Sequence, residues 1–325
     1  MWHLLSHRFA HINLGNLCIS SGLALLVMAG PAFAMDQNLA GQSTLQKHIA
    51  DDIQWIHAGE KEGLEPLKLG WLWAHLASNY QDSMEFEKSE SAYNHALRLM
   101  EPLPDAQKDY AIVLDNLGSL YVMSGKFDDS ERCRKRALAV RMRLGDALEV
   151  ARGRAHLAEV YLGRHKFKDA RQEANEAYTA MVALKEPEPS QVVAVLVTLI
   201  YSECELKQCK NAVDHARAAL SYASDAKPVD VLALGQAHLA LGYAEWRNGI
   251  KDNPDEEMRE GIRIMRSQEL PTHPYVLSAM EQYRIYLESE HRGPEAQEIA
   301  EQERTAAARP HDACPQCTVS VYGLR

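Results

Sequence analysis

Aromatic residues are scarce in this chain, and positive charge is in the minority. Phe, Trp and Tyr make up 7% of the 325 residues, and 35 lysines and arginines face 45 aspartates and glutamates, so the formal net charge is −10. A protein this acidic has no electrostatic attraction to a phosphate backbone, so we do not expect nucleic acid as a partner. Few aromatic rings and many small side chains are what closely packed helices need.

The motifs that commonly mark an active site are missing as well. The sequence has no nucleophile elbow, no glycine-rich phosphate loop and no His-Glu-x-x-His stretch. Its carboxylates are spread along expected helix surfaces, where charge mainly keeps helices soluble. We therefore expect a protein that is not an enzyme and that holds neither a cofactor nor a metal ion. An enzyme of an unrecognised type is the less favoured alternative.

Long apolar runs are also lacking, apart from one near the start of the chain. The mostly apolar stretch from Leu17 to Met28 is short for a membrane span. A weakly basic start with Arg8 and three histidines comes before it, and the small-x-small triplet Ala32-Phe33-Ala34 follows. Residues 1–34 therefore indicate an export signal, with an uncleaved membrane anchor as the alternative. We expect an exported protein, periplasmic or secreted, that is not inserted in a membrane after cleavage.

A recurring tetrapeptide is the strongest pattern in the sequence. Ala-His-Leu-Ala occurs three times, at Ala74–Ala77, Ala155–Ala158 and Ala237–Ala240, with gaps of 81 and 82 residues. Related segments around Asn116 and Thr198 lie midway through the two gaps, so the true period is 40 to 42 residues, counted five times. A period in this range predicts an array of stacked repeats.

Each repeat is expected to be two helices joined by a short turn. In the second repeat the helices cover about 110–123 and 127–141, with Ser124-Gly125-Lys126 as the turn. Small residues such as Gly118 recur where helices must approach closely, and larger ones such as Tyr121 fill the spaces between them.

The sequence therefore divides into four parts. Residues 1–34 are the signal, and 35–64 are a polar segment followed by a capping helix that starts at Ser43. Residues 65–310 are the array, with about five repeats and a closing half-repeat, and 311–325 are a C-terminal tail.

The repeats resemble a known family, the tetratricopeptide repeat. The residues that carry the resemblance are Leu117-Gly118 with Tyr121, Leu157-Ala158 with Tyr161, and the spaced alanines of each second helix. The length of the units resembles the longer subtype found in kinesin light chains and in many bacterial proteins. The resemblance covers about residues 65–305. It implies an all-α, right-handed superhelical solenoid of helix-turn-helix units whose first helices line a concave groove.

Helical spacing then predicts which side chains this groove presents. The candidate groove residues are Trp71, His75, Ser78, Asp82, Asp115, Asn116, Ser119, Arg152, His156, Glu159, Thr198, Tyr201, His238, Leu241 and Glu245. One position of each repeat forms a polar column, which reads His75, Asn116, His156, Thr198 and His238. Polar side chains can satisfy the donors and acceptors of an extended peptide backbone, and the resemblance implies this use. The alternative is a solvated helix face, or histidines packed against the next helix.

The charges of the candidate groove indicate which segments it would accept. Arg152 is its one obvious cation, whereas five residues are acidic: Asp82, Asp115, Glu159, Glu205 and Glu245. We therefore expect neutral or basic partner segments and not acidic tails. Histidines with an ordinary pKa near 6.5 would also make binding depend on pH.

The tail contains a pair of cysteines, Cys314 and Cys317, preceded by His311. A disulfide between them is the expected state outside the cytoplasm, while half of a metal site and a redox-active pair remain alternatives. The other cysteines of the array show no spacing that matches a metal site.

Together these observations predict an exported, non-catalytic scaffold that captures an extended segment of a protein or peptide partner in its concave groove. A structural subunit of an envelope or secretion assembly is one alternative. A thiol or metal protein that uses the cysteine tail is another.

Overall fold

The computed structural model describes residues 31–185, 187–251, 253–268 and 274–307, and every regular element in these ranges is helical. The thirteen α-helices are labelled α2 to α14, and one short 3-10 turn, η1, covers Pro104–Ala106. No helix within the described ranges is long and apolar enough to cross a membrane. The expected all-α fold is confirmed.

Six helix pairs, here called units 1 to 6, follow the N-terminal helix α2 (Pro31–Glu62). Their first helices are α3 (Pro66–Asp82), α5 (Gln107–Met123), α7 (Ala147–Gly163), α9 (Pro189–Glu205), α11 (Val231–Arg247) and α13 (Pro274–Ser289). Their second helices are α4 (Phe86–Met100), α6 (Phe127–Leu144), α8 (Phe167–Val182), α10 (Cys209–Asp225), α12 (Pro254–Gln268) and α14 (Gly293–Ala307). The first helices begin 40 to 43 residues apart, which agrees with the period expected from the sequence. Unit 6 has both helices, so the expected half-repeat is a full pair.

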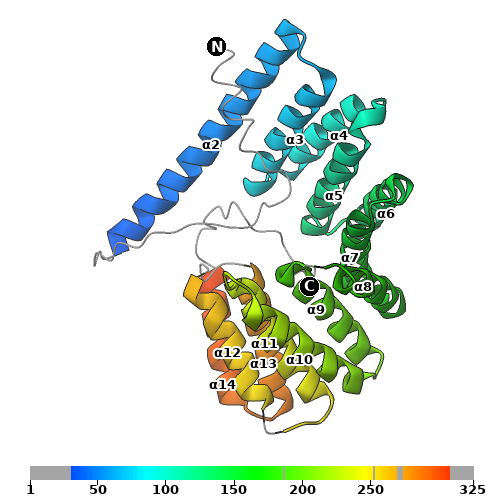
Figure 1. The fold of residues 1–325 in the computed structure, drawn as a ribbon. Coiled ribbons are helices and arrows are strands. Elements are labelled where there is room, and N and C mark those ends of the chain that lie inside the picture. The colour runs from blue at the N-terminus through cyan, green and yellow to red at the C-terminus, as the bar shows by residue number, and fades with distance from the viewer. Residues whose placement is uncertain (1–30, 186, 252, 269–273, 308–325) are drawn as a thin grey trace.

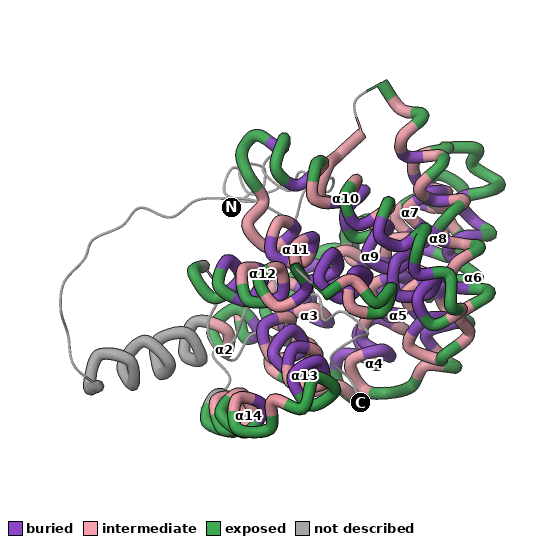
Figure 2. The backbone as a smooth tube through the Cα atoms, turned by 90° about the horizontal axis from the view of Figure 1, so that it is seen from below, coloured by how far each residue is buried: buried purple, intermediate pink, exposed green. Residues whose placement is uncertain are grey.

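The units stack into a right-handed superhelical solenoid, which Figure 1 shows as a curved array. In this view α5 and α7 lie toward the inner side of the curve, and α6 and α8 lie toward the outside. Figure 2 shows that buried residues gather where helices meet, and that exposed residues lie mainly at the periphery. The first helices therefore supply the concave side in units 2 and 3, as the family resemblance implies.

One turn geometry joins the two helices of every unit. In each turn one residue has a left-handed backbone, and these residues are Met84, Gly125, His165, Lys207, Gly249 and His291, with φ between 56° and 77°. In unit 2 the amide of Gly125 donates to Val122 O at 3.0 Å, and the amide of Lys126 donates to Tyr121 O at 2.7 Å. This pair of bonds is the Schellman motif, which satisfies carbonyls at a helix end. In unit 5 three more residues follow this turn before α12 begins at Pro254.

Small residues allow the two helices of a unit to touch. Ala77, Ala158 and Ala240, the last residues of the three tetrapeptides, have no exposed surface. In unit 1 the hydroxyl of Ser89 donates to the carbonyl oxygen of Ala77 at 2.7 Å, a contact that a larger residue would prevent. The packing role expected for these alanines is confirmed.

Helix α2 begins earlier than the sequence indicated. The expected start was Ser43, but the helix starts at Pro31, so the polar segment 35–42 is helical. Its second half covers unit 1 through Ile49 and Ile56, which pack with Leu76 of α3. Most of the expected signal lies outside the described residues, and so does the tail with Cys314 and Cys317.

Unit 5 packs differently from the units before it. A Cβ atom on Gly235 would lie 2.9 Å from the carbonyl oxygen of Gly261, so only glycine permits this approach of α11 and α12. Gly242 also faces α12, whereas in unit 2 the second helix meets Gly118, the counterpart of Ala240. Helix α12 therefore lies against a different face of its partner helix.

This change closes the C-terminal half of the solenoid. The hydroxyl of Tyr201 in α9 donates to Gln282 Oε1 in α13, two units away. Trp246 of α11 meets Tyr286 of α13 edge to face, with 5.8 Å between the ring centroids. Units 4 to 6 thus form a compact bundle, while units 1 to 3 form a more open arc (Figure 1).

Candidate functional site

The candidate groove residues divide into an accessible group and a buried group. The residues that keep partly exposed surface are Trp71, His75, Ser78, Asp82, Asn116, Ser119, Arg152, His156, Glu159 and His238. The buried residues are Asp115, Thr198, Tyr201, Leu241 and Glu245. Four of these five lie in units 4 and 5, where the bundle closes over the inner face, so they are not available to a ligand in this structure. The accessible concave face belongs to units 1 to 3.

In unit 1, His75 holds a carboxylate of the N-terminal helix. Its Nδ1 lies 2.9 Å from both carboxylate oxygens of Asp52, and Asn79 Nδ2 donates to one of them at 2.7 Å. The hydrogen bond to Asp52 raises the pKa of His75, and the opposing effect of burial is smaller. Asp52 is fully buried, whereas 57% of the His75 side chain is exposed. His75 therefore ties α2 to α3 through Nδ1, while more than half of its side chain stays exposed.

Asp115 lies at the centre of an ion-pair network between units 2 and 3. It pairs with Arg141 of α6, and its Oδ2 lies 3.2 Å from His156 Nδ1 of α7. Arg141 Nε also donates to Glu149 Oε2 at 3.3 Å. Burial by itself raises the pKa of Asp115, but His156, Arg141 and Arg134 outweigh it and hold that pKa below its usual value. Asp115 thus belongs to the frame of the array and not to its free surface.

The other charged groove residues of units 2 to 4 are also paired. Arg152 donates to Gln191 Oε1 at 3.0 Å and to Glu149 Oε1 at 2.9 Å. Glu159 accepts a hydrogen bond from Arg134 at 3.1 Å. Arg152, the one cation expected in the groove, is therefore already engaged.

Most side chains of the polar column are bonded to other residues of the protein. All three histidines lie against a carboxylate of another helix, and for His238 this is Glu257 of α12, at 2.7 Å. Thr198 bonds back to its own helix, at Ala194 O. Asn116 differs from the rest, because its half-exposed amide has no hydrogen-bond partner among the described residues.

Asp82, at the end of α3, is a second partly exposed groove residue without a hydrogen-bond partner among the described residues; the carboxyl of Glu245 also has none but is buried. Asp82 makes no hydrogen bond or ion pair within the described ranges, and it is half-buried. Burial raises its pKa from 3.8 to about 6, and the charge of His75 only partly opposes this. The carboxyl therefore changes its charge close to neutral pH.

A small cavity of about 160 Å³ opens between α7 and α9. Its lining residues are Arg152, Ala155, His156, Glu159, Met181, Gln191, Ala194, Val195 and Thr198. It lies where units 3 and 4 meet, and the buried Thr198 forms part of its wall.

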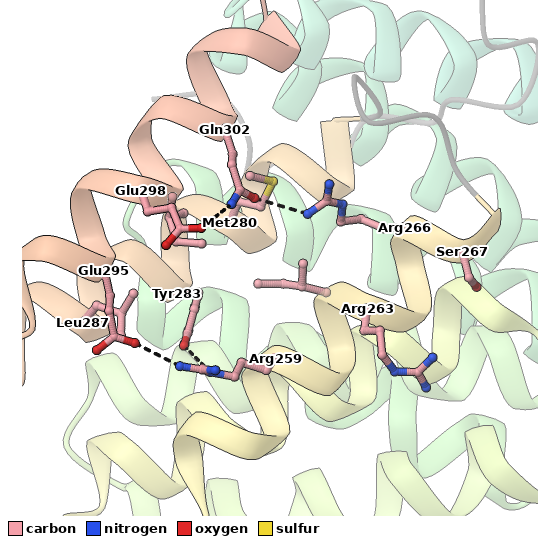
Figure 3. Close-up of a pocket in the computed structure, with 12 residues that line it drawn as sticks. Arg259, Arg263, Arg266, Ser267, Met280, Tyr283, Leu287, Glu295, Glu298 and Gln302 are labelled. Carbon is pink, nitrogen blue, oxygen red and sulfur yellow. Dashed lines mark hydrogen bonds and ion pairs between the residues drawn. The ribbon is translucent and has the colours of Figure 1, made fainter. Parts of the chain in front are cut away.

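A larger cavity of about 550 Å³ lies in unit 6 and beside α12, away from the polar column. Figure 3 shows arginines of α12 on one wall and acidic or amide side chains of α14 on the other, above a floor from α13. Hydrogen bonds already bridge the two walls, from Arg259 to Glu295 at 3.0 Å and from Arg266 to Gln302 at 3.3 Å.

No group of three or more histidine, cysteine, aspartate or glutamate side chains in the described part of the chain could hold a metal ion. The pair of Cys314 and Cys317 lies outside these residues.

Comparison with known proteins agrees with the geometry. A family model described as tetratricopeptide repeat matches residues 69–143 and 109–181, which cover units 1 to 3. The chain contains tetratricopeptide repeats. Such repeats generally form interaction scaffolds without catalytic activity. No curated protein matches the chain.

Solved structures show the same repeat fold at low sequence identity. BtubC (BKLC) from P. vanneervenii is 21% identical, and the match covers 69% of this chain and 91% of that one, with a TM-score of 0.60. The apo form of RapI is 13% identical, with 84% and 96% covered and a TM-score of 0.68. A Rap protein complexed with Competence and Sporulation Factor is 13% identical, with 82% and 77% covered and a TM-score of 0.54. At these identities the likeness shows the fold alone.

In this tetratricopeptide-repeat protein, the sequence analysis did not identify the charged residues that the second helices contribute to the site. Arg134 and Arg141 are buried, at positions where other units have residues such as Ala174 and Met181. Two arginines on the inner face of one helix were a signal for buried carboxylate partners, since a buried charge is rarely left unpaired. Asp52 was missed because the groove was sought only on the first helices.

Proposed function

We propose that this protein is an exported, non-catalytic interaction scaffold that binds an extended segment of a protein partner along the concave face of units 1 to 3. The observation that carries the proposal is the state of Asp82 and Asn116. Both side chains are partly exposed, helical spacing predicts that both belong to this face, and neither has a hydrogen-bond partner within the described residues. Half-buried polar groups without partners gain more from a ligand than groups that are already paired.

The chemistry of these two side chains defines the partner. The carboxylate of Asp82 accepts hydrogen bonds from a lysine or arginine side chain, and the amide of Asn116 can pair with a peptide group. Arg152 is occupied by Glu149 and Gln191, so it offers little to an acidic segment. The net charge of −10 also attracts basic partners at long range. The ligand is thus an extended, neutral or basic segment.

Fold-level analogy supports binding by such an array. One protein of similar fold, a Rap protein, is complexed with Competence and Sporulation Factor. This comes to the present chain only as an analogy, because fold by itself does not set the partner.

Binding of defined peptides tests the proposal. Extended peptides that differ only in charge, basic, neutral or acidic, are titrated against the exported protein by fluorescence anisotropy. We expect basic peptides to bind most tightly, and Asp82→Asn to weaken them by about tenfold or more, since a hydrogen bond to a charged group contributes about 1.5–3 kcal/mol. Asp105→Asn, an exposed aspartate in η1, is the matched control. If the three peptides bind wild type and Asp82→Asn with equal affinity, and the helicity is unchanged, the alternative of a structural subunit in an envelope or secretion assembly is favoured instead.

Acidification gives a second readout on the same site. Because burial raises the pKa of Asp82 to about 6, lowering the pH from about 7.5 to 5.5 should weaken binding of a basic peptide. The same change should leave the Asp82→Asn variant almost unaffected. A wild-type affinity that does not vary with pH would argue against a role for this carboxyl.

Export and the state of the tail complete the proposal and are tested separately. N-terminal sequencing of protein from the secretory compartment should find Met35 as the first residue. Thiol titration of the same material should show Cys314 and Cys317 oxidised, and two free thiols there would remove the proposed disulfide. If replacing both by serine abolishes the activity of the protein in cells, the thiol or metal alternative gains support.

A further inference from the structure

Two cysteines of unit 4 lie on opposite sides of the turn between its helices. Cys204 is in the last turn of α9 and Cys209 is the first residue of α10. Both are free and buried, with 0% and 9% of their surface exposed. The thiol of Cys209 donates to the carbonyl oxygen of Cys204 at 3.8 Å.

The repeated turn explains why their side chains meet. In unit 2 the equivalent residues are Val122 and Phe127, which pack in one apolar cluster. In unit 4 the amide of Lys207 donates to Cys204 O at 3.0 Å, so the same turn is present. Unit 3 also has an apolar pair at these two positions, Leu162 and Phe167, whereas unit 4 has the two cysteines. The turn therefore holds the two cysteine side chains of unit 4 next to each other.

An open cavity of about 430 Å³ lies beside the two thiols. Its lining residues are Cys204, Lys207, Gln208, Cys209, Lys210, Asn211, Arg247 and Asn248. Arg247 is held by Glu205 at 2.6 Å, whereas Lys207 and Lys210 are exposed and make no ion pair within the described residues. The cavity therefore combines thiols with uncompensated positive charge, and its volume is in the range of small-molecule sites.

We propose that Cys204 and Cys209 form a disulfide through exchange with a small anionic disulfide, such as oxidised glutathione, that enters this cavity. One protein thiolate attacks a sulfur of the small disulfide, forms a mixed disulfide and releases one small thiol. The second protein thiolate then attacks the protein sulfur of the mixed disulfide and releases the second small thiol. The two protein thiols lose two electrons and two protons in total, and the small disulfide takes them up.

Exposure sets the order of the two steps. Cys209 has the surface that a disulfide can reach, so it forms the mixed disulfide, and Cys204 resolves it from inside. Burial raises the pKa of the Cys204 thiol, and the neighbouring Cys209 adds to this effect. A thiol of this kind attacks slowly in solution but is held next to its target here.

Peptide mapping of the full chain tests the pair. The protein is incubated folded with oxidised glutathione at about pH 8.5, then unfolded in the presence of an alkylating agent and digested with trypsin. Because Lys207 separates the two cysteines, trypsin yields two peptides that only a disulfide can join. We expect the joined peptides, with Cys133 of unit 2 still alkylated as the internal control. A stable glutathione adduct on Cys209 in the wild type, or both cysteines alkylated, would overturn the proposal.

Single substitutions separate the two steps. Cys204→Ala should trap glutathione on Cys209, because the resolving thiol is gone. Cys209→Ala should leave Cys204 unmodified in the folded protein. Modification of Cys204 in that variant would show that the order, and with it the role of the exposed thiol, is wrong.

A neutral oxidant tests the charge of the co-reactant. Raising the ionic strength should slow the reaction with oxidised glutathione several-fold and leave the reaction with 2-hydroxyethyl disulfide, which is uncharged, almost unchanged. Lys210→Gln should have the same selective effect. If both oxidants show the same salt dependence, the proposal that the co-reactant is an anionic disulfide is wrong, and only the disulfide between Cys204 and Cys209 remains supported.

Discussion

Replacing Asp82 by asparagine should make the protein more stable at neutral pH while weakening its proposed function. Asp82 is half-buried without a partner, and burial raises its pKa from 3.8 to about 6. Asparagine has nearly the shape of the protonated acid and never ionises. The substitution therefore removes the cost of placing a charge in this site.

The size of the effect follows from the pKa shift. A rise of about 2 pKa units at about 1.4 kcal/mol each gives a ceiling near 3 kcal/mol. Because the side chain keeps part of its solvent contact, we expect about 1–2 kcal/mol. The folded pKa lies above the unfolded one, so the contribution of the protonated carboxyl is complete below about pH 3.8 and is lost as the pH rises through about 6.

Urea unfolding of Asp82→Asn and wild type across this pH range measures the difference. Trp71 and Trp73 lie in the same helix as Asp82, so tryptophan fluorescence of a Trp246→Phe background reports mainly on the N-terminal end of the array. The stability difference should be close to zero at about pH 3.5, grow through pH 6 and level off above pH 7. Asp105→Asn, at an exposed site, should show no such growth. A difference that is independent of pH, or a variant less stable than wild type at about pH 8, would refute the argument.

Three further predictions concern the frame. Arg141→Met leaves the buried carboxylate of Asp115 without its closest cation and should lower the free energy of unfolding by about 3–5 kcal/mol, while adding Asp115→Leu should recover much of the loss in the same urea assay. Asp52 raises the pKa of His75, so the contact between α2 and α3 stabilises the protein fully below about pH 6.5 and loses this contribution above the raised pKa. Amide hydrogen exchange in α2 should therefore rise with pH by more than the intrinsic exchange rate does. The substitution His75→Gln should abolish this extra rise. Gly235→Ala should cost about 1–3 kcal/mol or more, because the new Cβ lies 2.9 Å from a backbone oxygen of α12, and a thermal transition as high as that of the wild type would contradict this.

Local pattern was enough to predict the repeats but not every contact between them. The period, the turns and the buried alanines follow from the sequence, because each unit repeats the same short-range spacing. Helix α2 was expected to start at Ser43, since the sequence before it has no apolar stripe. The structure starts this helix at Pro31.

The candidate site was predicted only in part, for a physical reason. The concave positions of α3, α5 and α7 were identified from helical spacing, and most of them keep exposed surface. The ion pairs of the histidines were not predicted, because Asp52 and Glu257 lie on α2 and α12, and the groove was sought only on the first helices. The closure over Tyr201 depends on how α12 packs against Gly235, which no single helix pattern encodes.

The sequence by itself determined the architecture of this protein, because a solenoid is built from contacts between neighbouring units that one period describes. It also predicted which residues of the first helices belong to the concave face. Only the tertiary structure decided which inward side chains stay free, since the choice depends on charges and glycines from different units that meet in space. It leaves Asp82 and Asn116 available while it uses the histidines to hold the frame together.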